Sequence, residues 1–220
     1  KWDDGIAILS GDAMLSLALE LLNQSPNRLQ SQMKIFIKGL LAVCEGQAID
    51  KEFETQDYVD FNNYIHMIDL KTGHMIGLAA ELGALSSNVE SSICKSIRNY
   101  GRLVGRAFQI QDDYMEIFSD STSMGKSLES DILLDKKTYL MILAKEKNKE
   151  VIAKYLLKAK TNFNDGLIEI RKYMTEEGIK DRVLEEIELI LKEADVLLSN
   201  LPIKKDNLIY FSELIKKRGH

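Results

Sequence analysis

The sequence predicts an all-α fold, a bundle of long helices. Proline occurs only twice among 220 residues, at Pro26 and Pro202, so long stretches can stay helical without interruption. Apolar residues recur at spacings of three and four along most of the chain, and we find no strand-like alternation. Apolar residues make up 45% and charged residues 29%, which is typical of a globular protein with a core. We therefore expect a single domain over residues 1–220.

The first half of the chain divides into helical segments separated by polar turns. We expect an apolar helix over Ile6–Leu22, a turn at Ser25–Asn27 and a second helix over Leu29–Cys44. A polar acidic loop follows at Ile49–Gln56, and then a long helical run at Asp57–Leu85. The long run contains Thr72-Gly73, and threonine and glycine both weaken a helix interior. This pair predicts a kink.

The second half contains another long helix and a charged helical tail. We expect a helix over Asn88–Phe118, a polar loop over Ser119–Met124 and then some short helices. Three further helices follow, at Lys149–Met174, Lys180–Leu198 and Leu208–Lys217. The last three have charged outer faces, which we interpret as solvated surface.

Composition excludes several function classes. The net charge is −5 without a basic block, so we expect no nucleic-acid partner. No apolar run reaches the ~18 residues of a membrane span, so we expect no stable membrane insertion. Cys44 and Cys94 are isolated in apolar contexts; we interpret them as core residues of a cytoplasmic protein. Lys1 is not a natural start, so we expect a preceding segment.

Three acids stand close together in an apolar helical run. Asp112 and Glu116 are four apart and share one helix face, and Asp113 points roughly 100° away from Asp112. Mg²⁺ usually takes one or two carboxylates together with substrate phosphates, and such a face suits it. The alternative is an exposed acidic patch, which apolar neighbours such as Phe108 and Ile117 disfavour.

Spaced lysines follow the acids. Lys126 is followed five residues later by Asp131, which is followed five residues later by Lys136. Lysine binds phosphate as a point charge, and fixed cations stabilise the charge that develops on a leaving diphosphate. Any one of these lysines alone would be an ordinary surface residue; their joint spacing is the informative feature. For Lys71, which lies beside Thr72, the alternative interpretation is a simple irregularity of the helix.

These motifs resemble those of the trans-type polyprenyl diphosphate synthases. The matching segments are Phe108-Gln-x-x-Asp-Asp-x-x-Glu116, Gly125-Lys-x-x-x-x-Asp-x-x-x-x-Lys136, Lys71-Thr72 and Gly46-Gln-x-x-Asp50. The resemblance covers nearly the whole chain, from Ala7 to Pro202 and the terminal helix. It departs at Glu116, where the family has Asp. It implies an isoprenoid-synthase helical bundle with a central metal and diphosphate cavity.

The resemblance also implies roles for individual residues. Mg²⁺ would be held by four acids, namely Asp112, Asp113, Glu116 and Asp131. The allylic diphosphate would bind three lysines, namely Lys71, Lys126 and Lys136. Thr72 and Gln109 would line the carbocation site, and Phe108 would pack against the homoallylic substrate. Gln47 and Asp50 would face the cavity near the metals, with a helix-end cap as the alternative for this segment.

Some family motifs are absent from these 220 residues. The first aspartate-rich motif, Asp-Asp-x-x-Asp, is not found, and neither are the basic residues that bind isopentenyl diphosphate. We expect these on N-terminal helices that the chain lacks. Asp3-Asp4 is not the missing motif, because no third acid follows at the required spacing.

The resemblance implies a short-chain prenyltransferase that joins isopentenyl diphosphate to an allylic diphosphate, and a homodimer. A farnesyl or geranylgeranyl product is the default. Two alternatives stay open. A class I terpene cyclase uses similar metal chemistry, but Gly125-Lys126 favours the synthase. A non-catalytic regulatory subunit tends to lose motif acids, whereas Asp112, Asp113 and Asp131 are retained.

Overall fold

The chain folds into a bundle of long helices, which confirms the predicted fold class. The computed structural model describes residues 3–119, 132, 134 and 136–218, and every regular element among them is helical. These elements are α1 (Asp4–Asn23), α2 (Leu29–Phe53), α3 (Phe61–Ile68), the π-helix η1 (Asp69–Gly73), α4 (His74–Ser86), α5 (Ser91–Phe118), α8 (Tyr139–Thr161), α9 (Phe163–Glu176), α10 (Ile179–Ser199) and α11 (Asp206–Lys217).

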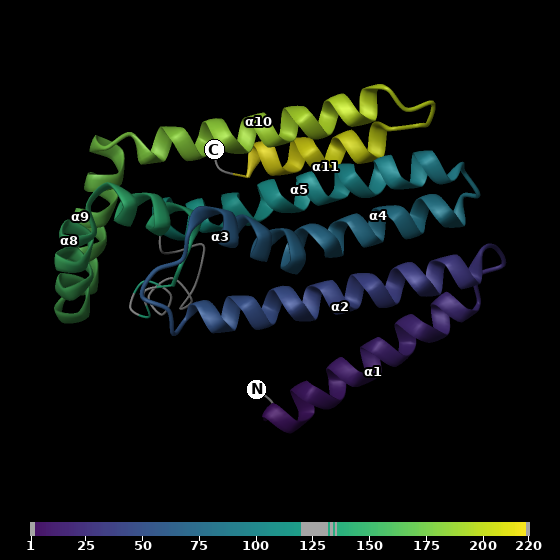
Figure 1. The fold of residues 1–220 in the computed structure, drawn as a ribbon, viewed down its shortest axis with the longest axis horizontal. Helices are drawn as coiled ribbons and strands as arrows, with labels where there is room; N and C mark the ends of the chain where they lie inside the picture. The colour runs from purple at the N-terminus through teal and green to yellow at the C-terminus, as the bar shows by residue number, and fades with distance from the viewer. Residues whose placement is uncertain (1–2, 120–131, 133, 135, 219–220) are drawn as a thin grey trace.

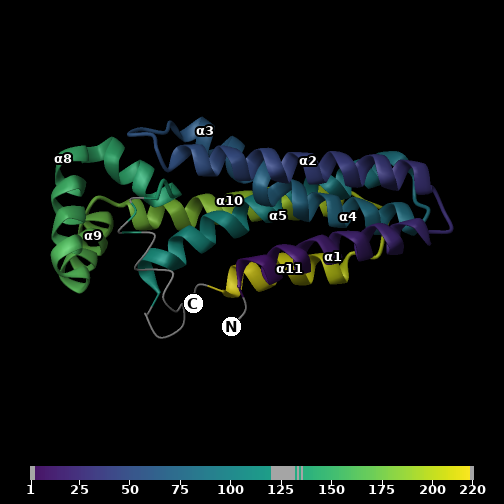
Figure 2. The same cartoon turned by 90° about the horizontal axis from the view of Figure 1, so that it is seen from below.

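Helix α5 lies at the centre of the bundle. It packs along α4 on one side and along α10 on the other, and α11 also contacts it (Figure 1). Helix α2 runs beside α4, while α8 and α9 form a pair that stands across one end of the long helices (Figure 2). The helix that carries the acidic motif is therefore surrounded by other helices along much of its length.

The main apolar core follows α5 from Tyr100 to Ile117. Ile110 and Ala107 are fully buried there, and the same cluster continues to Tyr139 and Leu140 at the start of α8 and to Ile215 in α11. Burial of this apolar area is the main favourable term in the folding of the domain. It also makes α5 a rigid support for polar side chains.

Glycines bring the backbones of three helices into contact at the centre of the bundle. A Cβ atom on Gly105 would lie 2.8 Å from Cα of Gly73, and one on Gly101 would lie 2.8 Å from Cα of Gly77. On the opposite side of η1, a Cβ atom on Gly46 would lie 2.4 Å from the backbone nitrogen of Lys71. Only glycine permits such approaches, so η1 is clamped between α2 and α5.

The interruption predicted at Thr72-Gly73 is confirmed: a π-helical turn, η1, lies there between α3 and α4. A π-turn inserts one residue into a helix and often marks a functional site. It shifts the side chains after it around the helix axis relative to those before it. Side chains of α4 therefore point in directions that an uninterrupted helix continuing from α3 would not give them.

Some of the predicted boundaries are wrong. The helical run expected from Asp57 begins only at Phe61. Helix α2 continues to Phe53, so the loop expected from Ile49 begins only after this residue. The single helix expected over Lys149–Met174 is broken at Asn162, whose side chain accepts a hydrogen bond from the backbone of Asp165 and caps α9. Helix α8 has a non-helical backbone at Asn148, so a short helix from Tyr139 precedes the helix expected from Lys149. Most of the loop expected at Ser119–Met124 and the first part of the segment expected to form short helices lie outside the described residues.

Helix α1 is the least embedded element. It contains no buried residue and contacts α2. By length and apolar composition alone, α1 could cross a membrane, so the expectation that no apolar run reaches this length is wrong. Core helices of globular proteins and signal sequences meet the same criterion. The expectation of a core position is also wrong for Cys44, which is exposed, whereas Cys94 is buried.

Candidate active site

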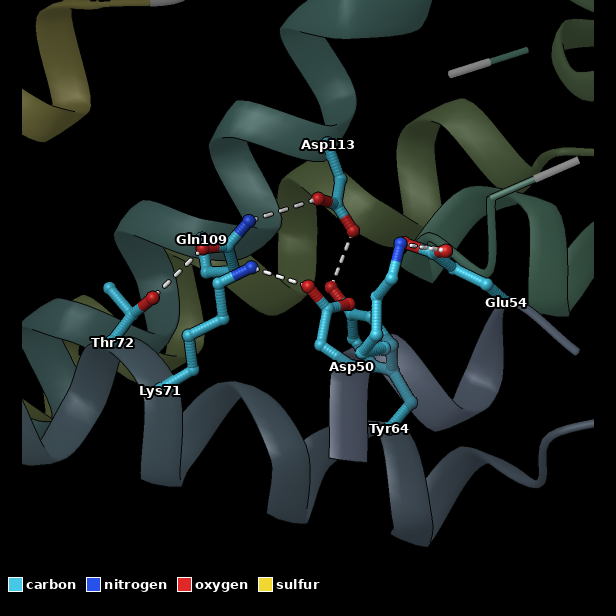
Figure 3. A network of polar contacts seen from close by, with 8 residues as sticks. Asp50, Glu54, Tyr64, Lys71, Thr72, Gln109 and Asp113 are labelled. Atoms are coloured by element: carbon cyan, nitrogen blue, oxygen red, sulfur yellow. Dashed lines mark hydrogen bonds and ion pairs between the residues drawn. The ribbon is translucent and has the colours of Figure 1, made fainter. Parts of the chain in front are cut away.

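Lys71 projects from the π-turn toward α2. Its ammonium nitrogen lies 2.5 Å from Oδ2 of Asp50, and both side chains are mostly buried (Figure 3). Gly46 lies one turn before Asp50 in α2, where it allows the helix to touch the backbone of η1. The segment Gly46-Gln-x-x-Asp50 therefore has a physical explanation: the glycine sets the helix distance and the acid orients the lysine.

A chain of hydrogen bonds links the π-turn to α5 and α3. The hydroxyl of Thr72 donates to Oε1 of Gln109 at 2.9 Å, and Nε2 of Gln109 donates to Oδ1 of Asp113 at 3.2 Å. The hydroxyl of Tyr64 donates to Oδ2 of the same carboxylate (Figure 3). The backbone N–H of Tyr139 also donates to Oδ2, at 2.8 Å. Asp113 thus joins η1, α3, α5 and the start of α8.

Asp113 is buried, and burial raises its pKa to about 6. The hydrogen bonds from Tyr64, Tyr139 and Gln109 oppose this shift, as does the positive charge of Lys136. Tyr64 is fully buried, and its pKa is raised well above the ordinary value by burial and by the charge of Asp113. Tyr64 therefore stays a neutral donor.

Asp112 lies on a different face of α5. Its Oδ1 is 2.9 Å from Nη1 of Arg218, and the Arg218 guanidinium also sits over the ring of Phe108, 4.5 Å from the ring centre. Partial burial raises the pKa of Asp112, and the pairing with Arg218 opposes that shift. Glu116, one turn further along α5, is buried.

An ion cluster around the buried Asp69 anchors the π-turn. Asp69, its first residue, pairs with Arg102 and Arg106 of α5; the distance to Arg106 is 3.3 Å. Burial alone would raise the pKa of Asp69, but the hydrogen bonds and charges of the two arginines outweigh it and lower the pKa. This cluster fixes η1 to α5 two residues before Lys71.

The structure brings several of the predicted site residues together. Five of them lie in one network or its immediate neighbourhood, namely Asp50, Lys71, Thr72, Gln109 and Asp113. Phe108 and Asp112 form a second group around Arg218. Gln47 is exposed. Lys126 and Asp131 lie outside the described residues.

The sequence analysis missed three participants. Tyr64 is buried. Because a buried tyrosine hydroxyl needs a hydrogen-bond partner, its position in an apolar stretch was the signal that could have revealed it. Asp69 lies two residues before Lys71 and gave no signal by spacing. Arg218 reaches Asp112 only through the packing of α11 against α5, which no local pattern reveals.

The described residues contain no group of three or more acids, histidines or cysteines that could hold a metal ion by itself. The Asp112 carboxylate is about one-third exposed and supplies hard oxygen atoms. This fits a Mg²⁺ ion that takes few protein carboxylates and completes its shell with phosphate oxygens and water.

The chain is similar to known prenyl synthases in sequence. A model of the polyprenyl synthetase family matches residues 1–174. The geranylgeranyl diphosphate synthase of Methanosarcina mazei is 35% identical over 150 residues, which are 67% of this chain and 46% of that protein. The short chain isoprenyl diphosphate synthase of Methanothermobacter thermautotrophicus is 34% identical over 68% of this chain and 46% of its own length. The chain thus spans about half the length of the curated relatives it matches.

Solved structures show the same fold. The geranylgeranyl pyrophosphate synthetase of Pyrococcus horikoshii superimposes with a TM-score of 0.86 at 30% identity, over 97% of this chain and 67% of that one. The corresponding enzyme of the archaeon Geoglobus acetivorans gives a TM-score of 0.83 at 28% identity, over 96% and 67%.

Proposed function

The chain belongs to the polyprenyl synthetase family, and we propose that it forms part of the active site of a short-chain trans-prenyltransferase. The enzyme would condense isopentenyl diphosphate with an allylic diphosphate to give a linear prenyl diphosphate, of farnesyl or geranylgeranyl length. The observation that carries this proposal is the π-turn. From this turn the Lys71 ammonium bonds to Asp50 of α2, and the Thr72 hydroxyl bonds to Gln109 of α5, the helix that also bears Asp112.

The proposed reaction begins when the bond between C1 and oxygen of the allylic diphosphate breaks, and diphosphate leaves with the electron pair. Lys71 would stabilise the negative charge on this leaving group, together with Lys136 and Lys126. The double bond of isopentenyl diphosphate then forms the new carbon–carbon bond at C1. A proton of the isopentenyl unit is lost, and the departed diphosphate is the base at hand.

The hydroxyl of Thr72 and the amide of Gln109 would line the site of the allylic cation. Because the Thr72 proton is donated to Gln109, the Thr72 oxygen is left as an acceptor. An oxygen acceptor is the polar group that stabilises a nearby positive charge. Phe108 would contact the homoallylic substrate, but only after the Arg218 guanidinium moves off its ring.

We propose Mg²⁺ as the cofactor, held by Asp112 and, outside the described residues, by Asp131, with Glu116 as a further candidate. When bound, Mg²⁺ supplies positive charge that draws electrons toward the diphosphate and fixes its position. Asp113 was grouped with these ligands in the sequence analysis. Both of its oxygens accept hydrogen bonds from protein donors, so we assign it to the framework of the site instead.

We further propose that the protein is a cytoplasmic homodimer. Helix α1 exposes large apolar side chains along its length, and α2 adds exposed apolar residues at Ile37 and Leu41. Apolar surface of this extent usually marks an interaction site, and a second copy of the same helices would cover it symmetrically. Sedimentation equilibrium in detergent-free buffer checks this: a dimer is expected, and a monomer would contradict it.

The decisive experiment is a Mg²⁺-dependent assay of the protein extended by its upstream sequence. Labelled isopentenyl diphosphate would be supplied with dimethylallyl, geranyl or farnesyl diphosphate, and the products separated by length. Linear prenyl diphosphates are expected. Hydrocarbon released from the allylic diphosphate without incorporation of label would indicate a cyclase. No reaction with any substrate, despite an intact first aspartate-rich motif, would indicate a regulatory subunit.

A further inference from the structure

Every hydrogen bond in the chain from Thr72 to Tyr64 points toward one carboxylate. Thr72 donates to Gln109, Gln109 donates to Asp113, and Tyr64 donates to Asp113 from the opposite side. A carboxylate only accepts hydrogen bonds, so Asp113 determines the orientation of the Gln109 amide. In the reversed orientation the amide oxygen of Gln109 would face the Asp113 carboxylate, and two acceptors would meet.

The orientation of Gln109 in turn determines what Thr72 can offer. With the amide oxygen of Gln109 facing it, Thr72 must donate its proton there. A reversed amide would donate to Thr72, and the hydroxyl proton would be free to point elsewhere. The direction of the Thr72 hydroxyl is therefore set by a group that lies two hydrogen bonds away.

Tyr64 holds that distant group in place. It is 1% exposed and lies in α3, and its ring also meets the ring of Tyr139 edge-on at 6.0 Å. Asp113 is 5% exposed, so water is not available to replace a lost donor. A buried carboxylate that loses its tyrosine partner must turn toward its remaining donors, Gln109 and the backbone N–H of Tyr139.

We propose that Tyr64 is a positioning residue of the active site. Through Asp113 and Gln109 it fixes the Thr72 hydroxyl as a donor to Gln109, which leaves the Thr72 oxygen as an acceptor, and it holds the π-turn that presents Lys71. This inference rests on the proposed function for its catalytic meaning, but its structural part concerns the network alone. Tyr64 itself touches neither substrate nor metal in this proposal.

The test compares two tyrosine-to-phenylalanine variants of the 220-residue chain. Tyr64→Phe keeps the ring and removes only the hydroxyl. Tyr100→Phe is the matched control: Tyr100 is 2% exposed, and its hydroxyl bonds to the carbonyl of Leu208 and to Ser212, which belong to α11. Hydrogen–deuterium exchange followed by mass spectrometry would report the protection of the peptide over residues 69–75.

Tyr64→Phe is expected to speed exchange in this peptide, and Tyr100→Phe to leave it unchanged. Asp113→Asn should affect the same peptide, and the double variant with Tyr64→Phe should add little to Asp113→Asn alone, because both changes interrupt one chain. Equal protection of residues 69–75 in Tyr64→Phe and in the unchanged chain would overturn the proposal.

Titration calorimetry with inorganic pyrophosphate and Mg²⁺ supplies a second measurement. Tyr64→Phe is expected to weaken pyrophosphate binding about fivefold, the value of one ordinary hydrogen bond, while Tyr100→Phe leaves it unchanged. Equal binding by both variants would overturn the positioning role. If the unchanged chain binds no pyrophosphate, the proposed function loses support, and the exchange experiment still decides the role of Tyr64.

Discussion

Replacing Gly46 by alanine should destabilise the protein. The added Cβ would lie 2.4 Å from the backbone nitrogen of Lys71 and 2.8 Å from Cβ of Leu70, about 1 Å short of ordinary contact. Both atoms are held by the π-turn, which α5 clamps from the other side at Gly105, so α2 must move away. Overpacking against such a rigid surface costs about 3 kcal/mol, and the higher helix propensity of alanine returns about 1 kcal/mol. We expect a net loss of about 2 kcal/mol in the free energy of unfolding.

Urea unfolding followed by circular dichroism measures this loss, and Gly83→Ala is the matched control. Gly83 also lies within a helix, α4, but an added Cβ there meets nothing within 4 Å. Gly83→Ala should therefore stabilise the protein by up to about 1 kcal/mol. The two variants should differ by about 3 kcal/mol. Equal stability of the two variants would refute the argument that Gly46 sets the distance between α2 and the π-turn.

Three further predictions concern charged groups. Asp69→Asn should cost about 2 kcal/mol of unfolding free energy at neutral pH, because it leaves two half-buried arginines, Arg102 and Arg106, without their partner. The pKa of Asp69 is lower in the folded state than in the unfolded state. The contribution of Asp69 to the free energy of unfolding is therefore complete above its unfolded pKa of about 3.9, and it is lost as the pH falls through the folded pKa. The denaturation curves of the variant and the unchanged protein should converge in acid. Asp112→Ala in the extended protein should lower kcat by on the order of 10² or more in the prenyl transfer assay, and a fall below about tenfold would contradict its metal role. Arg218→Gln should tighten Mn²⁺ binding about threefold in paramagnetic resonance titrations, because it frees Oδ1 of Asp112, whereas Lys217→Gln, which removes the same charge one residue away, should not.

The fold class and the position of the helix interruption at the candidate site could be predicted from the sequence. The rarity of proline and the helical spacing of apolar residues are local properties, and they fixed most of the helices. Thr72-Gly73 marked the interruption in the long run because both residues weaken a helix locally. The π-helical form of that interruption was not predictable, since it depends on Gly46 and Gly105 from two other helices.

The partners of the site residues were beyond the reach of local patterns for the same reason. Tyr64 and Asp113 are 49 positions apart, and Arg218 reaches Asp112 from the far end of the chain. Such contacts depend on how helices pack rather than on the spacing within any one of them. The helix boundary expected across Asn162 was wrong because this side chain caps a new helix, whereas the start expected at Lys149 agrees with the break at Asn148.

The two neighbouring aspartates of α5 illustrate how one turn of helix serves two purposes. Asp112 is partly exposed and pairs with a mobile type of side chain, an arginine near the end of α11, so a cation can replace that partner. Asp113 is buried and bonded on both oxygens by groups from α3, α5 and α8. Their roughly 100° separation around the helix axis is the cause of this division. If Asp112 binds Mg²⁺ as proposed, the pair of adjacent acids provides one ligand that can exchange its partner and one anchor that cannot, and a substitution that suits one position will fail at the other.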